Sequence, residues 1–259
     1  MGNYIYYIIV VIAGLAVGSF LNVLVLRFDQ FETILVTRSR CPHCKKEIKW
    51  YDLVPFVSYI YLGAKCRYCQ KPISIQYPIV EGLTGLVFGL IYWKFGLSWS
   101  ALLLAFSSSL LIAVATYDIL NYEMPDVLSY LALIFGLGFV LVNLSSQRML
   151  TWSNFTSYVY AFLVGGGFLA LLVTISREKW MGAGDIVIGA TMGILVGWPN
   201  ILLGLFAAFV AGSIIGLVLL ALKKKTIKDA VPFGPFLVLG TFVAVFWGDK
   251  IVNWYLGIF

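Results

Sequence analysis

The sequence is short of charge and nearly lacks histidine. Only 12% of its 259 residues are charged, against about 25% in soluble domains, which excludes a water-soluble globular protein. His43 is the single histidine, so Ser-His or Cys-His catalysis and the HExxH motif of metalloproteases have almost no residues to draw on. Disorder is also excluded, because 61% of the residues are hydrophobic whereas disordered chains are polar and charge-rich.

Long apolar stretches fill the sequence instead, and they predict an all-α polytopic membrane protein. A helix that spans a bilayer needs roughly 20 apolar residues. Eight stretches approach this requirement, at 4–26, 76–93, 98–117, 127–144, 155–175, 181–197, 200–222 and 232–254. The first lacks the basic segment and small-residue cleavage site of a signal peptide, so we expect it to remain as a membrane helix. The sixth stretch has the shortest continuous apolar run. We therefore expect its helix to be tilted, to cross a thin part of the membrane, or to be partly re-entrant.

The basic residues predict the orientation of these helices. One side holds 15 Lys and Arg and the other side holds three. The basic side consists of the connections 27–75, 118–126, 176–180 and 223–231. By the positive-inside rule this side is cytoplasmic, and both termini lie outside. The net charge of +6 is therefore mostly a topology signal accompanied by contact with anionic lipid, and nucleic-acid binding is not expected.

The four cysteines all lie in the 27–75 connection, as two C-x2-C pairs. The pairs are Cys41 with Cys44 and Cys66 with Cys69. In a reducing cytoplasm this spacing predicts a tetrahedral zinc site rather than two disulfides, with four free thiols as the alternative. Four thiolates leave no open position for a reactive water, so we expect a structural zinc that compensates for the small core of this loop.

These features predict three parts of the chain. Residues 1–26 form the first membrane helix, residues 27–75 form a zinc-ribbon-like cysteine loop domain, and residues 76–259 form a seven-helix membrane core. Within that core, acidic residues in or beside the helices are functional candidates, because burying an ionisable group in a membrane is costly.

Two aspartates are expected at the same cytoplasmic depth. Asp118 directly follows the third apolar stretch, Asp185 lies in the sequence MGAGD at the start of the sixth, and two full crossings separate them. Two facing carboxylates hold their protons unequally, so that one can act as a base on water, as in aspartic proteolysis. Gly182 and Gly184 would let a substrate backbone approach Asp185 closely. The alternative is that both aspartates are solvated helix ends.

Further acids lie in the 118–126 connection and in the second apolar stretch. Glu123 and Asp126 add to Asp118 in a connection without basic residues, which would attract a positively charged peptide segment. Asp126 could equally begin a helix after Pro125. The sequence leaves open whether Glu81 serves a substrate or cofactor pocket or only reaches the membrane interface.

Motifs along nearly the whole chain resemble those of bacterial type IV prepilin peptidases, which are GxGD membrane aspartic proteases. The motifs are GSFLNVLVLR at 18–27, the paired CxxC loop, YPIVEGLTG at 77–85, D-x6-PD at 118–126, MGAGD at 181–185 and PFGPFL at 232–237. The resemblance implies a protease of the bacterial inner membrane that removes a short basic leader from prepilin or pseudopilin precursors at the cytoplasmic face. It also implies N-methylation of the new N-terminus with S-adenosylmethionine.

The resemblance further implies roles for particular residues. Asp118 and Asp185 match the catalytic aspartates, Asp126 matches a supporting aspartate, and the four cysteines match a metal-binding motif. Val187 departs from the pattern, because family members often have a lysine there. A presenilin-like protease, an ion or proton transporter and a membrane scaffold are the alternatives. The cysteine loop and the PD turn favour the prepilin class over the presenilin type, and the chain lacks the repeated halves typical of transporters.

Overall fold

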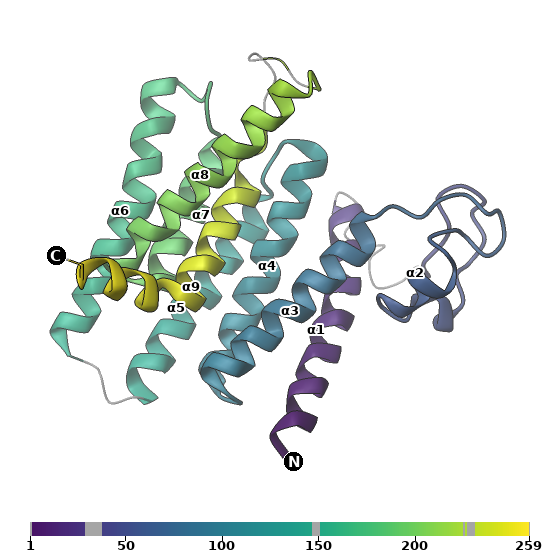
Figure 1. The fold of residues 1–259 in the computed structure, drawn as a ribbon, viewed down its shortest axis with the longest axis horizontal. Helices are drawn as coiled ribbons and strands as arrows, with labels where there is room; N and C mark the ends of the chain where they lie inside the picture. The colour runs from purple at the N-terminus through teal and green to yellow at the C-terminus, as the bar shows by residue number, and fades with distance from the viewer. Residues whose placement is uncertain (1, 29–37, 147–150, 225, 227–230, 259) are drawn as a thin grey trace. The chain divides into compact units, whose positions relative to one another are not determined.

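The fold is all-α, as predicted. The computed structural model describes residues 2–28, 38–146, 151–224, 226 and 231–258 (Figure 1). Parts of the predicted 27–75 and 223–231 connections lie outside these residues. Within the described ranges the chain forms helices, and its β structure is limited to two isolated bridges. Contacts divide the chain into unit 1, Met1–Gly96, and unit 2, Leu97–Phe259.

Unit 1 is built on two long helices that pack along each other. Its elements are α1 (Gly2–Leu26), the 3-10 helix η2 (Trp50–Leu53), α2 (Val57–Tyr61) and α3 (Gln76–Phe95). A Cβ added to Gly14 would lie 2.8 Å from the Cα of Gly85, and one added to Gly18 would lie 2.7 Å from the Cα of Glu81. Small residues let membrane helices pack this closely, so the backbones of α1 and α3 are nearly in contact.

The described part of unit 2 forms six helices. They are α4 (Trp99–Asn121), α5 (Asp126–Ser146), α6 (Trp152–Ser176), α7 (Ala183–Val196), α8 (Asn200–Ala221) and α9 (Gly234–Leu256). Each covers one predicted stretch, but α4 continues four residues past the predicted end at 117. The helix is capped by Tyr122, which has a left-handed φ of 59° and whose N–H donates to the carbonyl oxygen of Asp118 at 2.9 Å. Asp118 therefore lies in the last turn of α4.

The chain is a multi-pass membrane protein. Within the described residues, six helices are long and apolar enough to cross a membrane, namely α1, α4, α5, α6, α8 and α9. The polar residues of α3, including Glu81, and its glycines make it less apolar than these six, and α7 is apolar but has only 14 residues. Eight crossings, as predicted from the sequence, require α3 and α7 to span as well.

The short helix α7 is surrounded by protein. It packs against α5, α6, α8 and α9, and the side chains of Ile188, Thr191 and Met192 are completely buried. A helix of 14 residues is about 21 Å long, less than the roughly 30 Å hydrocarbon thickness. Because neighbouring helices surround α7, backbone at its ends can lie at membrane depth without facing lipid.

Close packing of α6 on α7 should depend on Gly189. A Cβ there would lie 2.8 Å from the carbonyl oxygen of Gly165 and 2.5 Å from a methyl carbon of Leu169. We expect Gly189→Ala to destabilise the protein by about 1–3 kcal/mol, because the helices must move apart. Gly167→Ala on α6 is the control, since no described atom lies within 4 Å of a Cβ at that position. Thermal unfolding of the purified proteins measures the difference, and equal melting temperatures would contradict this account.

Candidate active site and metal centre

Asp118 and Asp185 are both buried in unit 2. Asp118 is 5% exposed in the last turn of α4, and Asp185 is 3% exposed in the first turn of α7. Met124 lies between their surroundings, because it contacts Gly184, the residue before Asp185, and also Gly234, whose N–H binds Asp118. Burial of two interacting carboxylates favours a state in which they are not both ionised. The arrangement therefore differs from two solvated helix ends.

Each carboxylate accepts one backbone hydrogen bond. The N–H of Gly234, at the start of α9, donates to Asp118 Oδ2 at 3.0 Å, and the N–H of Gly182 donates to Asp185 Oδ2 at 3.0 Å. Asp185 Oδ1 is buried and has no hydrogen-bond partner within the described part of the chain. A buried polar atom without a partner is uncommon in folded proteins and is a feature of reactive sites. Asp185 Oδ1 is therefore available to a proton, a water or a substrate.

Met124 packs three segments of the site together. A Cβ on Gly184 would lie 2.7 Å from Met124 Cβ, and a Cβ on Gly234 would lie 2.6 Å from Met124 Cε. The same Cβ on Gly234 would lie 2.7 Å from Asp118 Oδ2. The α4–α5 connection, the GAGD sequence and the start of α9 thus converge at the aspartates, and larger residues at the two glycines would push Met124 or Asp118 away.

The other predicted site residues have different surroundings. Gly184 faces Met124, whereas no described atom lies within 4 Å of a Cβ placed on Gly182. The space beside Gly182 is open next to Asp185, as close approach of a substrate backbone would require. Glu123 and Asp126 are exposed, and Asp126 is the first residue of α5.

Sequence reasoning missed Gly234 and Met124 as parts of the site. Gly234 contributes its backbone N–H and its lack of a side chain, neither of which is visible as a chemical group in a sequence. The one available signal was the PFGPFL segment at 232–237, which contains Gly234. Met124 carries no charge and no ionisable group, so only its contacts identify it.

The four cysteines of unit 1 form one cluster. Their sulfurs all lie within 4.8 Å of one another, Cys41 Sγ is 3.8 Å from Cys69 Sγ, and all four thiols are free. Four sulfurs around a zinc ion, each at about 2.3 Å, would be separated by about 3.8 Å. The cysteine cluster therefore fits a tetrahedral divalent metal ion.

The two halves of the cysteine cluster are built in the same way. Cys41 N–H donates to the carbonyl of Lys46 at 3.0 Å, and Cys66 N–H donates to the carbonyl of Lys71 at 2.9 Å. Left-handed residues complete both turns, with φ of 58° at Lys45 and 56° at Gln70. This local repeat brings the second cysteine of each pair back toward the first.

The thiols of the cluster ionise unequally. Burial raises the pKa of Cys41, but hydrogen bonds from the backbone of Cys44 and His43 and from neighbouring thiols outweigh it and lower the pKa to about 6. At Cys69 the backbone of Lys71 lowers the pKa, while burial and the other three thiols raise it to a net value of about 11. A bound cation would compensate the charge of all four thiolates.

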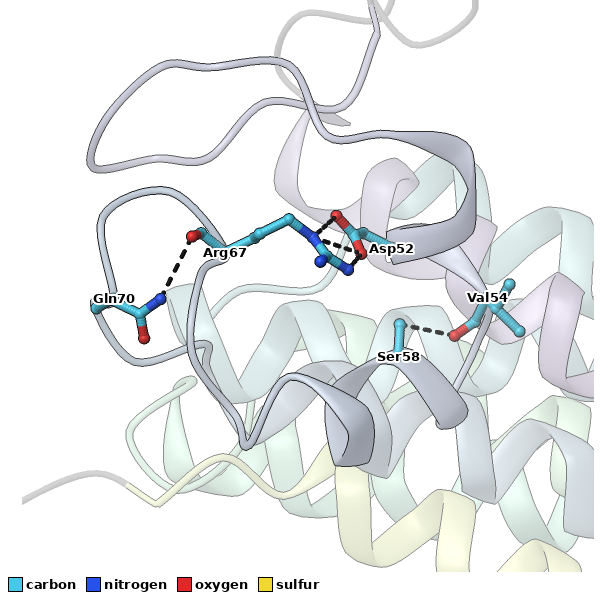
Figure 2. Close-up of polar contacts among 5 residues, drawn as sticks. All are labelled: Asp52, Val54, Ser58, Arg67 and Gln70. Carbon is cyan, nitrogen blue, oxygen red and sulfur yellow. Dashed lines mark hydrogen bonds and ion pairs between the residues drawn. The ribbon is translucent and has the colours of Figure 1, made fainter.

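An ion pair fixes the second cysteine turn to η2. Arg67 donates from Nε to Asp52 Oδ2 at 2.9 Å and from Nη2 to Asp52 Oδ1 at 2.6 Å (Figure 2). The Asp52 carboxylate raises the pKa of the Arg67 guanidinium above its usual value. Gln70 in turn donates from Nε2 to the Arg67 carbonyl at 3.3 Å. The ion pair thus links the turn that holds Cys66 and Cys69 to residues 50–61, the segment that contains η2 and α2.

Glu81 is buried in unit 1 and holds the backbone of that same segment. Its Oε2 accepts a hydrogen bond from the N–H of Phe56 at 2.8 Å. Phe56 immediately precedes α2 and has a left-handed φ of 62°. The role of Glu81 that these contacts show is to fix the turn into α2.

Comparison with known proteins gives the family. The sequence profile described as "Bacterial Peptidase A24 N-terminal domain" matches residues 12–95, and "Type IV leader peptidase family" matches residues 104–217. The chain is 32% identical over 281 residues to the prepilin leader peptidase/N-methyltransferase of Legionella pneumophila, which covers 97% of the chain and 94% of that relative. The chain belongs to the type IV leader peptidase family. It is a multi-pass membrane protease of that family.

Other members of the family show similar coverage. Proteins of the same name from Stutzerimonas stutzeri and Pseudomonas aeruginosa are 30% identical to the chain, over 95% of its length and 92% of theirs. No solved structure matches the chain. The two profile matches fall within units 1 and 2 respectively, so the leader peptidase match contains both aspartates, while Gly234 lies beyond it.

The cysteine cluster should bind metal in the purified protein. We expect about one divalent ion per chain, because four thiolates complete a tetrahedral site. Cys66→Ser should lower the metal content and the melting temperature, since metal-binding energy adds to folding energy. His43→Asn, in the turn that holds Cys41 and Cys44, is the control and is expected to keep the metal. Elemental analysis measures the content, and wild-type metal content in Cys66→Ser would contradict the assignment.

Proposed function

We propose that Asp118 and Asp185 are the catalytic pair of an endopeptidase that cleaves the leader from prepilin-like precursors. The observation that carries this proposal is the burial of two interacting carboxylates, each with one oxygen bound by a backbone amide. The match to the type IV leader peptidase family supports the substrate class.

The proposed reaction is general acid–base hydrolysis. One deprotonated aspartate takes a proton from water, while the other, protonated, polarises the scissile carbonyl and later donates its proton to the leaving amine. The backbone amides of Gly234 and Gly182 hold one oxygen of each carboxylate and leave the other for these transfers. The protons belong to the pair, so no fixed acid and base are assigned.

The open space at Gly182 supports the proposed route of the substrate. A scissile bond in extended conformation would lie beside Gly182, next to Asp185. The exposed carboxylates of Glu123 and Asp126 would attract the basic leader, and Asp126 is otherwise a supporting residue.

The remaining parts of the proposal concern topology and cofactors. With α3 and α7 as the additional crossings, the excess of basic residues supports a cytoplasmic position of the cysteine cluster and the aspartates at the bacterial inner membrane, with both termini outside. The cysteine cluster would hold a structural zinc, with no metal needed for the peptidase step. The relatives' name supports N-methylation with S-adenosylmethionine, which mass spectrometry of the cleaved product would detect.

Either aspartate should be required for cleavage. We expect Asp118→Asn and Asp185→Asn to lose all measurable cleavage of a purified prepilin, because an amide cannot exchange the proton. The isosteric change should leave membrane insertion and the melting temperature close to wild type. Val187→Ala on α7 is a control that should remain active. Robust cleavage by either asparagine variant would refute the pair.

Gly234 should act as a positioning residue for Asp118. Gly234→Ala would place a Cβ 2.7 Å from Asp118 Oδ2, so the carboxylate must move from its amide. We expect kcat to fall by about 10–100-fold, equivalent to about 1.4–2.7 kcal/mol, with KM within about twofold of wild type. Gly216→Ala on α8 has open space and is the control. Wild-type kcat in Gly234→Ala, with Asp118→Asn inactive, would show that Gly234 does not position the aspartate.

A further inference from the structure

The cysteine loop of unit 1 carries a cluster of exposed apolar side chains. They belong to Trp50, Leu53, Phe56, Val57, Ile60 and Tyr61, and we name them the 50–61 surface. Trp50 is 80% exposed, Tyr61 79% and Ile60 65%. Val57, Ile60 and Tyr61 share one face of α2, because residues three and four apart on a helix are neighbours. Contiguous exposed apolar side chains outside the membrane helices mark an interaction site.

Hydrogen bonds fix the shape of the 50–61 surface. The Arg67 guanidinium binds the carboxylate of Asp52 in η2, and Ser58 Oγ donates to the carbonyl of Val54 at 2.7 Å (Figure 2). The short helix α2 packs against η2. Asp52 and Ser58 are thus bonded within the loop, while the apolar side chains of the 50–61 surface are exposed.

Glu81 ties this surface to the helix pair formed by α1 and α3. The N–H of Phe56 binds Glu81 on α3, and Glu81 packs against Gly18 of α1, which is long and apolar enough to cross a membrane. Gly18 lies eight residues before the end of α1 at Leu26, which is about 12 Å along the helix. The hydrogen bond from Phe56 to Glu81 therefore ties the start of α2 to the part of α3 that packs on α1, a helix long and apolar enough to cross a membrane.

The charges around the surface match an anionic lipid leaflet. Five lysines of the described part of the loop are exposed, namely Lys45, Lys46, Lys49, Lys65 and Lys71. The two carboxylates of this part of the loop are paired, Glu47 with Arg38 and Arg40, and Asp52 with Arg67. Aromatic side chains accompanied by lysines are typical of segments that lie in the membrane interface.

We propose that the 50–61 surface docks into the anionic lipid leaflet at the membrane face from which the cysteine loop emerges. Trp50 and the outward face of α2 enter the headgroup and acyl boundary, and the lysines contact lipid phosphates. Docking holds the cysteine cluster close to the membrane, because the Asp52–Arg67 pair joins the 50–61 surface to the second cysteine turn. This inference depends on the position of the loop and is independent of the aspartate chemistry.

Photo-crosslinking of the full chain tests directly whether lipid contacts the 50–61 surface. Benzoylphenylalanine replaces Ile60 in one variant and the exposed, polar Gln70 in the control, both in nanodiscs of phosphatidylethanolamine and phosphatidylglycerol. We expect lipid adducts at Ile60 at a yield several-fold above that at Gln70, detected by mass spectrometry of the peptide. The yield at Ile60 should fall when phosphatidylcholine replaces the phosphatidylglycerol, because the lysines lose their anionic partner.

A second variant links the adducts to the apolar face. Val57→Gln, combined with benzoylphenylalanine at Tyr61, should reduce lipid adducts at Tyr61 several-fold while metal content and melting temperature stay close to wild type. Crosslinks from Ile60 to residues 97–259, to a second copy of the chain or to an added prepilin, in place of lipid, would overturn the proposal. Equal lipid yields at Ile60 and Gln70 would overturn it as well.

Discussion

A carboxylate buried between membrane helices needs hydrogen-bond donors, and the arrangement of unit 2 follows from this requirement at Asp118 and Asp185. Asp185 takes its donor from the turn that starts its own helix, where Gly182 is the N-cap residue of α7 and its N–H donates to the carboxylate. Asp118 ends a helix, so its donor must come from elsewhere, and α9 supplies it through Gly234. The start of α9 is thereby fixed against the end of α4. Met124 fills the space between these segments, and a Cβ on Gly184 or Gly234 would crowd it.

Unit 1 also contains a buried carboxylate that accepts a hydrogen bond from a backbone amide. Its buried carboxylate, Glu81, binds the N–H of Phe56 and thereby holds a left-handed residue at the start of α2. Close packing of α3 on α1 at Gly18 makes this contact lie beside a membrane helix. The same type of interaction, a buried carboxylate with a backbone amide, serves chemistry in unit 2 in our proposal and positions a loop in unit 1.

Much of the fold could be predicted because apolar length is encoded locally. Every predicted stretch contains a helix, and even the weak stretch at 181–197 corresponds to the short helix α7. Prediction was poorer where neighbours decide the outcome. A 14-residue helix is stable here because α5, α6, α8 and α9 bury it, and no local pattern reports that burial. In the same way, η2 and α2 were not foreseen, since their conformation depends on Glu81 and Arg67, which are distant in sequence.

The sequence by itself determined the class of molecule, the cysteine pairs and the scarce acids from which chemistry could be drawn, because each of these depends only on residue type and spacing. The tertiary structure decided which acids are buried and what surrounds them. It separated Asp118 and Asp185 from the exposed Glu123 and Asp126, and it brought in Gly234 from more than 100 residues along the chain. The reason is physical: a backbone amide and an absent side chain have no signature in residue type, and they act only once helices that are distant in sequence have packed together.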